Sequence, residues 1–374
     1  MQVKLPAYFK FVIILLGIVL VFMIMQAAQA ILAPLVVSGF LAILVSPFTS
    51  WQEKKGMPRI LAILISLIAL AAFIAGAIYF FYNQMLGFAP ELTAIEGRIN
   101  DLIESINIFL AQNIEGVVPI SMDNIRETIF QQVYANMDQL TRGIIATAGT
   151  LTMVFIMPVY IFLFLYFRDF LAEFLKRAFS EKYSDKVAKV LNKVKFVVQN
   201  YIVGMFIVIC ILAVLNSIAL YSLGIKHALL FAVFAAFLNV IPFLGPFIGA
   251  TLPIMYALLV KDSLWYPFGV FLSFYVIQLM ESNIFTPGIV GGKVSMNPLM
   301  TIITLIVGYF VWGIIGMILF IPGMAILKVI FDEIEGMEPY GFLLGKIRHE
   351  SEDPPPGQRQ EPRLLSEIKK RMKF

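Results

Sequence analysis

The stretch that decides the fold runs from residue 227 to residue 260 and reads HALLFAVFAAFLNVIPFLGPFIGATLPIMYALLV. Two apolar arms flank a centre that contains Pro242, Gly245, Pro246 and Gly249. Proline removes a helical hydrogen bond and glycine permits a tight turn, so one helix ends here and another begins. Each arm is shorter than the about 20 residues that cross a bilayer. The stretch is therefore expected to form a broken, re-entrant helical hairpin.

A second broken stretch covers residues 294–330. Its apolar run begins at Pro298 and is interrupted by Gly313 and Gly316 before it reaches Pro322. One spanning helix is expected between the two stretches. The second hairpin is therefore expected to enter from the opposite side of the membrane. Two hairpins of opposite orientation form an inverted repeat, in which a binding site lies between the halves near the middle of the membrane.

The composition indicates a membrane protein. Of the 374 residues, 60% are hydrophobic and 14% are charged, and the mean hydropathy is +0.88, whereas a soluble domain has about 25% charged residues. Charged residues are absent from the runs 11–52, 60–90, 143–167, 196–225, 227–260, 263–280 and 294–327. The first run is long enough for two spanning helices, and four others suit one each. We predict an all-α polytopic membrane protein with about six full spans and the two hairpins.

Lysine and arginine near the ends of the spans orient the chain, because they favour the cytoplasmic side. Residues 168–198 are rich in lysine and 83–141 are mainly acidic. We therefore expect both termini and a helical connector at 168–198 in the cytoplasm, and 83–141 outside. In this external region, 91–110 and 125–140 have apolar residues at helical spacing. They are expected to be amphipathic helices that lie on the membrane, on a partner subunit or on the chain's own spans.

The expected parts of the chain follow the membrane crossings. They are the membrane helices of 1–82, the external region of 83–141, a fourth membrane helix in 142–167, the connector of 168–198, a core of 199–331 with both hairpins, and a cytoplasmic tail of 332–374. The tail holds a proline-rich linker followed by a short basic segment. This last segment is expected either to be an amphipathic helix on the inner leaflet or to be disordered.

Polar residues in the membrane portion are few, and they define the candidate site. Glu281 ends a charge-free run, and an ionisable group at membrane depth is costly and functional by default. Burial favours the neutral form of a carboxyl group, so Glu281 is a candidate for proton coupling; the alternative is a solvated residue at the cytoplasmic rim. Further residues expected to bind a solute or an ion are Gln278, Asn283, Asn239 and Thr286, and Asn216 is another amide within a span. The residues expected at the hairpin tips are Pro242, Gly245, Pro246, Gly249, Gly313 and Gly316.

Several kinds of chemistry are absent from the sequence. The Gly291-Gly292-Lys293 motif lacks the hydroxyl residue of a nucleotide-binding loop, and no nucleophile elbow occurs. One cysteine and two histidines cannot assemble a Cys/His zinc site, and a net charge of +4 is too small for nucleic-acid binding. We expect no catalytic residue, metal or cofactor. His227 is expected to be a solvated loop residue and Cys210 a packed thiol.

The broken segments resemble a known family. Residues Asn239 to Gly249 are similar to the Pro-x-x-Gly-Pro-x-x-Gly signature of the autoinducer-2 exporter (AI-2E) family, and so is the later Gln278-x-x-Glu281-Ser282-Asn283 motif. Further matching positions are Pro287, Asn297-Pro298, Gly308, Gly313, Gly316 and Pro322. The resemblance extends over about residues 1–345. It implies a bacterial inner-membrane protein with about seven or eight membrane segments, assembled as a homo-oligomer such as a pentamer. Its members are assigned to export of the furanone signal autoinducer-2, while others are similar to sodium/proton antiporters.

Three functions are compatible with these features. The favoured one is a gradient-driven secondary transporter that exports a small polar solute such as autoinducer-2, coupled to a proton or a sodium ion. The second is a monovalent cation/proton antiporter in which Glu281 exchanges the proton. The third is a passive pore or an envelope scaffold. Because 227–260 and 294–327 contain no lysine or arginine, the site suits a neutral polyol or a desolvated cation better than a multiply charged anion.

Overall fold

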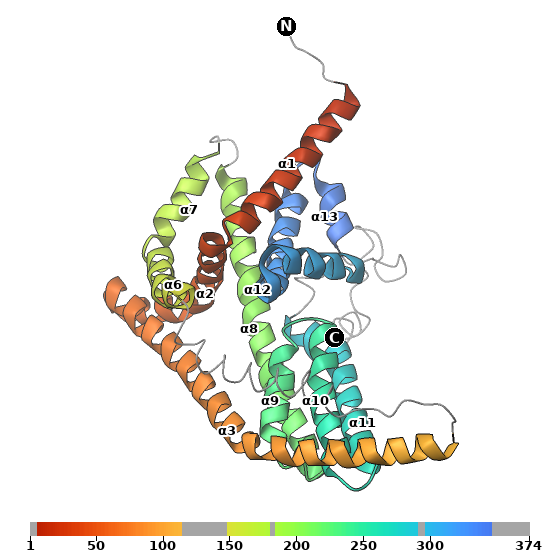
Figure 1. The fold of residues 1–374 in the computed structure, drawn as a ribbon. Coiled ribbons are helices and arrows are strands. Elements are labelled where there is room, and N and C mark those ends of the chain that lie inside the picture. Colours follow the sequence, from red (N-terminus) through yellow and green to blue (C-terminus); the bar gives the residue numbers. More distant parts are fainter. Residues whose placement is uncertain (1–5, 114–147, 180–183, 291–295, 346–374) are drawn as a thin grey trace, which may run out of the picture.

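The structure is a computed structural model that describes residues 6–113, 148–179, 184–290 and 296–345 (Figure 1). Helices make up nearly all of these residues, and the strand-like pairing among them is limited to one bridge between Met296 and Gly345. In chain order the helices are α1 (Ala7–Ala27), α2 (Gln29–Lys54), α3 (Arg59–Asn113), α6 (Ala148–Tyr166), α7 (Arg168–Arg177), α8 (Ser184–Ser222), α9 (Ala228–Leu238), α10 (Leu244–Val260), α11 (Trp265–Met280), the π-helix η3 (Glu281–Val290), α12 (Pro298–Glu333) and α13 (Glu338–Leu344). The predicted all-α architecture is confirmed.

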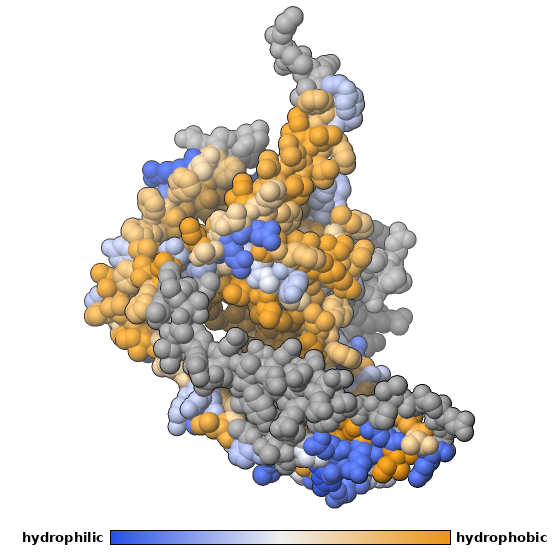
Figure 2. All heavy atoms as spheres, in the orientation of Figure 1, coloured by the Kyte–Doolittle hydropathy of each residue, from blue (hydrophilic) through white to orange (hydrophobic). Residues whose placement is uncertain are grey.

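Apolar helices of membrane length form most of the molecular surface. By length and composition, the described residues hold 5 helices that could cross a bilayer, or up to 6 if the pair α6–α7, bent by 64°, is one span. Hydrophobic side chains cover most of the face seen in Figure 2, and hydrophilic ones gather at its lower end, where the second half of α3 lies. Exposed apolar surface of this extent requires lipid or a partner. The chain is therefore a polytopic membrane protein, as predicted.

Helix α8 is the axis around which the other helices pack. Its 39 residues span about 58 Å at 1.5 Å per residue, and it contacts α2, α7, α9, α11, η3 and α12. The expected connector does not end at residue 198, because the lysine-rich start of α8 continues without a break into its apolar part. Cys210 on this helix is exposed rather than packed as expected, because it lies on the outward face of α8.

The first broken stretch, 227–260, folds as a hairpin with α9 and α10 as its closely packed arms. A Cβ atom on Gly245 would lie 1.9 Å from the carbonyl oxygen of Leu238, and one on Gly249 would lie 2.8 Å from Cα of Ala235. These positions accept glycine alone unless the backbone moves. Arms of 11 and 17 residues are about 16 Å and 26 Å long, short of the about 30 Å of hydrocarbon.

The second broken stretch, 294–330, is also a hairpin, because α12 is folded back on itself at its centre. Trp312 (φ −136°) and Gly313 (φ +61°, ψ −141°) interrupt the helix. The arms meet where a Cβ atom on Gly316 would lie 1.9 Å from the carbonyl oxygen of Gly308. Residues so far apart along a straight helix are separated by about 12 Å, so this contact requires a reversal. Although α12 is long enough to span a bilayer, it returns towards the end from which it began.

Helix α13 holds the two ends of α12 together. The side-chain amide of Asn297 donates to the carbonyl oxygens of Leu343 at 2.6 Å and Gly345 at 3.1 Å. At the other end of α12, Asp332 packs against Gly341. A Cβ atom added to Gly341 would lie 2.1 Å from Oδ1 of Asp332. Both ends of the second hairpin therefore lie on the same side of the molecule.

The two hairpins insert from opposite ends of α8. Ala228, at the base of the first hairpin, is buried with Leu220 near the carboxyl end of α8. Glu333, at the base of the second, forms an ion pair with Lys193 in the amino-terminal part of α8. Figure 1 shows α9 and α10 at the lower end and α13 at the upper end. Ile241, at the tip of the first hairpin, packs against a core cluster on α12, so the hairpins have the inverted arrangement expected from the sequence.

Helix α3 is longer than the sequence predicts. The expected boundary at residue 82 falls inside one continuous helix of 55 residues, whose second half crosses the lower end of the molecule in Figure 1. Ile95 is buried there in a cluster with side chains of the first hairpin, and α3 contacts both α9 and α10. The expected helix at 91–110 therefore packs on the chain's own helices. The segment 125–140 and the tail after Gly345 lie outside the described residues.

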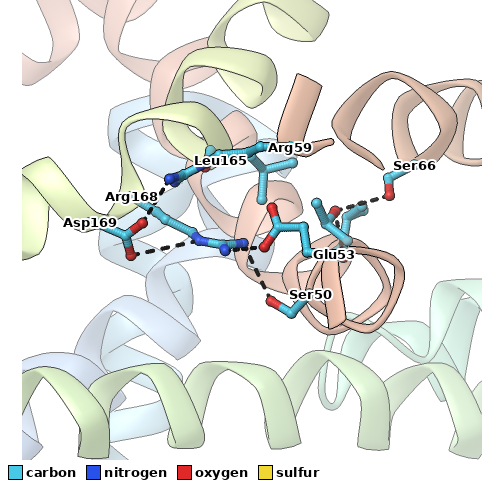
Figure 3. A network of polar contacts seen from close by, with 9 residues as sticks. Ser50, Glu53, Arg59, Ser66, Leu165, Arg168 and Asp169 are labelled. Carbon is cyan, nitrogen blue, oxygen red and sulfur yellow. Dashed lines mark hydrogen bonds and ion pairs between the residues drawn. The ribbon is translucent and has the colours of Figure 1, made fainter. Parts of the chain in front are cut away.

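Two arginines join the ends of α2, α3, α6 and α7 (Figure 3). Arg168 forms an ion pair with Glu53, and their side chains are only 28% and 19% exposed. Arg59 donates to Asp169 at 2.7 Å and to the carbonyl oxygen of Leu165 at 2.9 Å. Since each charge in this network has an opposite partner, its role is to fix the helix ends relative to one another.

Removing one member of this network is expected to destabilise the bundle. Arg168→Met leaves the Glu53 carboxylate without its cation, at an expected cost of about 1–3 kcal/mol, because the pair is only partly buried. Thermal unfolding in detergent should show a lower Tm. The double variant Glu53→Gln/Arg168→Met should recover part of the loss, because no unpaired charge remains. If the single and the double variant lower the Tm by the same amount, the network does not have this role.

Candidate functional site

A cavity of about 280 Å³ lies at the tip of the first hairpin, between α8, α9, α10 and α11. Its lining residues are Leu212, Asn216, Ala235, Asn239, Phe243, Pro246, Phe247, Ala250, Phe271, Phe274, Tyr275, Ile277 and Gln278. Leu212 stands near the middle of the charge-free run 196–225, so the cavity lies at about half the depth of the apolar part of α8. None of the lining residues is acidic or basic.

The break between α9 and α10 supplies one wall of the cavity. Pro242 has no N–H group to continue α9, and the chain then turns through Phe243, whose φ of +67° is strained for a residue with a side chain. The N–H group of Gly245 donates to the carbonyl oxygen of Ile241 at 2.9 Å and closes the turn. Phe243 and Pro246 line the cavity. The residues that interrupt the helix therefore also build the wall.

Three side-chain amides are the main polar groups of the cavity: Asn216, Asn239 and Gln278. Asn216 is 5% exposed and Asn239 is 7% exposed. The Oδ1 atom of Asn216 is buried and has no hydrogen-bond partner among the described residues. An unpaired buried acceptor is costly, which makes Asn216 a candidate for binding a solute or water.

Glu281 lies beside the cavity rather than in its wall. It is 9% exposed and is the one acidic or basic residue that is buried within the described part of the chain, so it is not a solvated rim residue. Nε2 of Gln278 donates to its Oε2 atom at 2.8 Å, and the hydroxyl group of Thr286 donates to its Oε1 atom. Thr286 comes within reach because 281–290 is a π-helix, in which a residue five positions later lies about one turn away.

The structure brings most of the predicted polar residues together. Asn239 and Gln278 line the cavity, and Gln278 links it to Glu281 and Thr286. Asn283 is different, because it is exposed and donates to a backbone carbonyl group of its own helix at 2.8 Å.

The second hairpin tip lies elsewhere. Gly313 supplies the turn and Gly316 the close contact between the arms, and neither lines the cavity. Beside them the indole N–H group of Trp312 donates to the carbonyl oxygen of Met25 at 2.9 Å, which fixes this tip against α1.

The aromatic wall of the cavity is the part that the sequence reasoning missed. Phe271, Phe274, Tyr275 and Gln278 recur at helical spacing and form one face of α11. Aromatic residues in membrane helices are ordinarily packing or lipid-facing residues, so the pattern by itself does not indicate a site. Gln278 on the same face is the feature that distinguishes this face of α11 from an ordinary packing face.

Comparison with known proteins fixes the family. The model of the AI-2E family of transporters matches residues 10–336. The chain belongs to the AI-2E transporter family. YrrI of Bacillus subtilis, named a putative transport protein, is 28% identical over 80% of this chain and 86% of its own length. The AI-2 transport protein TqsA of Escherichia coli is 21% identical over 91% of this chain and 96% of its own length. Family and relatives therefore indicate a transport protein rather than an enzyme.

A second polar cluster in this AI-2E transporter joins α3 to the base of the first hairpin. Glu91 forms an ion pair with Lys226 and accepts a hydrogen bond from the hydroxyl group of Tyr256. Nε2 of His227 lies 3.1 Å from Oε1 of Glu91, and the side chain of His227 is only 11% exposed. The expectation of a solvated His227 is wrong, because the rings of Phe88 and Tyr256 pack against it.

The close contact between the arms of the first hairpin should be essential for transport. In Gly249→Leu, the new Cβ atom would lie 2.8 Å from Cα of Ala235. The two arms must therefore separate, which is expected to lower the free energy of unfolding by about 1–3 kcal/mol. We expect normal insertion into the membrane, because the residue stays apolar, and loss of solute uptake. Gly76→Leu is the matched control, since its Cβ atom meets nothing within 4 Å. Full activity of Gly249→Leu would show that the arms need not touch.

The Glu91 cluster should hold α3 in a pH-dependent way. Burial alone would raise the pKa of Glu91, but the contacts with Lys226, Tyr256 and His227 outweigh it and lower the pKa from 4.5 to about 2. Because the folded pKa is the lower one, the contact stabilises the fold above about pH 4.5 and weakens as the pH falls towards 2.

Hydrogen exchange in the second half of α3 measures this effect. After correction for the intrinsic rate, exchange should be slow at neutral pH and accelerate progressively as the pH falls through that window. Glu91→Gln should exchange fast already at neutral pH. Slow exchange in this variant would show that the cluster does not hold the helix.

Proposed function

We propose that the chain is a gradient-driven secondary transporter that moves a small neutral polar solute through the cavity beside Asn216, Asn239 and Gln278. The observation that carries the proposal is a cavity at half depth, lined by amides and aromatic rings and by no charged side chain. Amides bind hydroxyl and carbonyl groups, and aromatic rings pack against the apolar face of a small ring. Autoinducer-2 is the proposed solute, because the relative TqsA is named for its transport, and export is the proposed direction.

The two hairpins support transport over a passive pore or an envelope scaffold. In transporters with inverted repeats, broken helices meet near mid-depth and one repeat moves against the other. Ile241 of the first hairpin contacts the second, so a movement of either one changes the space between them. A scaffold has no need of polar groups at this depth, where burying them is costly.

Glu281 is the proposed coupling residue. Its partners Gln278 and Thr286 are neutral, so a proton or a sodium ion is proposed to compensate its charge during transport. The same buried carboxylate favours a second candidate function, monovalent cation/proton antiport. Two observations argue against antiport. Gln278 stands between Glu281 and the cavity, and the cavity itself has no charged side chain that could bind a cation.

The bacterial inner membrane is the proposed location, with both termini in the cytoplasm. Lys186 and Lys193 lie at the amino-terminal end of α8, and α7 with Arg177 packs beside it. Bases near membrane helices favour the cytoplasmic side, which supports this orientation. A homo-oligomer such as a pentamer is the assembly implied by the resemblance to the family.

Reconstitution into liposomes tests the proposal. With autoinducer-2 as solute and proton or sodium gradients imposed separately, we expect saturable accumulation that disappears when the gradient is collapsed. Glu281→Gln should insert and assemble normally but lose accumulation, because an amide cannot exchange a proton, while solute exchange down its own gradient persists. Cys210→Ala, a change at an exposed position of α8, is the control and should match the unmutated protein.

The alternatives give different results in the same assay. Flux that does not saturate would indicate a pore, and cation movement against protons without solute would indicate antiport. No movement of any species would indicate a scaffold. Accumulation by Glu281→Gln at the unmutated rate would remove its coupling role.

A further inference from the structure

Glu281 is held by two neutral donors and forms no ion pair with any residue that the structure describes. One carboxylate oxygen accepts from Nε2 of Gln278 at 2.8 Å, and the other accepts from the hydroxyl group of Thr286. An ionised carboxylate has acceptor atoms only. The amide of Gln278 turns its NH₂ group towards Glu281.

Gln278 also belongs to the cavity wall. The nitrogen and oxygen of an amide group point in different directions, so with the NH₂ group anchored at Glu281 the carbonyl oxygen of Gln278 points away from that carboxylate. Asn216 contributes a second oxygen, Oδ1, which is buried and has no partner among the described residues. Two residues of the cavity wall thus carry amide oxygens for which the structure describes no donor.

The π-helix explains how both carboxylate oxygens are occupied. In an α-helix the residue one turn after Glu281 would be Phe285, which has no donor, whereas the wider π-helix brings Thr286 to that place. The Thr286 hydroxyl saturates one oxygen and leaves the other for Gln278. The irregular backbone therefore fixes the carboxylate in the orientation that holds the amide.

We infer that Glu281 is a positioning residue that orients Gln278, so that the cavity presents amide oxygens and selects solutes that donate hydrogen bonds. The inference rests on the proposed function and deepens it by naming a property of the solute. Glu281 acts through Gln278 and does not touch the solute. An analogue of the same size that lacks the donating hydroxyl groups at the matching positions leaves the oxygens of Asn216 and Gln278 unpaired in a buried site, and such sites reject these analogues strongly.

Exchange of radiolabelled erythritol across liposomes, without any ion gradient, tests the selection. The competitors are erythritol and its analogue with fluorine in place of the hydroxyl groups at carbons 2 and 3, because fluorine resembles a hydroxyl group in size but cannot donate. For the unmutated protein, the analogue should need about a tenfold higher concentration or more to compete. In Glu281→Gln this ratio should fall to about twofold, because an amide at 281 both donates and accepts and no longer fixes Gln278.

Ser282→Ala is the matched control. It removes an exposed hydroxyl group next to Glu281 that donates to backbone carbonyl groups at the end of α11 and accepts from the exposed side chain of Asn283. The ratio should stay at the unmutated value. If Glu281→Gln fails to fold, Gln278→Met removes one of the two oxygens and must lower the same ratio.

The side-chain amide resonance of Gln278, assigned by its loss in Gln278→Met, gives a readout independent of transport. It should move towards the position of a free amide in Glu281→Gln and stay in place in Ser282→Ala. An unmoved resonance, or an unchanged ratio in either Glu281→Gln or Gln278→Met, would overturn the inference. If the unmutated protein exchanges no erythritol while the resonance still moves, the proposed neutral solute is wrong, and with it the selection, whereas the positioning of Gln278 stands.

Discussion

The rest of the structure depends on one constraint, that backbone N–H and C=O groups cannot stay unpaired in hydrocarbon. The break after Asn239 releases such groups near the middle of the apolar part of α8, so protein must cover it. Helices α8 and α11 provide the cover, and the space they leave is the cavity. The second break, at Trp312 and Gly313, is covered instead by the amino-terminal helices, where Trp312 donates to Met25. The hairpins, the cavity and the position of α1 thus follow from the same requirement.

Close contact between helices then holds the hairpins together. Lipid is as apolar as a leucine side chain, so association of membrane helices depends on van der Waals contact and favours small residues. The first hairpin meets this need with Gly249 against Ala235, and the second with Gly308 against Gly316. The arms of each hairpin therefore pack closely, and the tip of the first hairpin reaches a core cluster on α12.

The presence or absence of a cationic partner distinguishes the structural acids from Glu281. At the ends of the molecule, each half-buried acid that the structure describes has a cation, as in Glu53 with Arg168, Glu91 with Lys226 and Glu333 with Lys193. Such pairs join helices and leave no net charge to be used. Glu281 has amide and hydroxyl partners instead. A carboxylate kept at depth without a cation is costly unless it has a task, which is why it stands out from the other acids.

The sequence by itself determined the membrane class, the spans and the two breaks, because charge-free runs and clustered proline and glycine act locally on the backbone. It also identified Glu281, Gln278, Asn239 and Thr286 as candidates, since polar residues are rare in apolar runs. The tertiary structure decided which of them meet: Asn283 faces outward, Asn216 joins the cavity, and the aromatic face of α11 completes its wall. It also decided that α3 continues past residue 82 and that His227 is buried against Glu91. These outcomes depend on contacts between segments distant in the chain, and such contacts leave no periodic pattern in a single sequence.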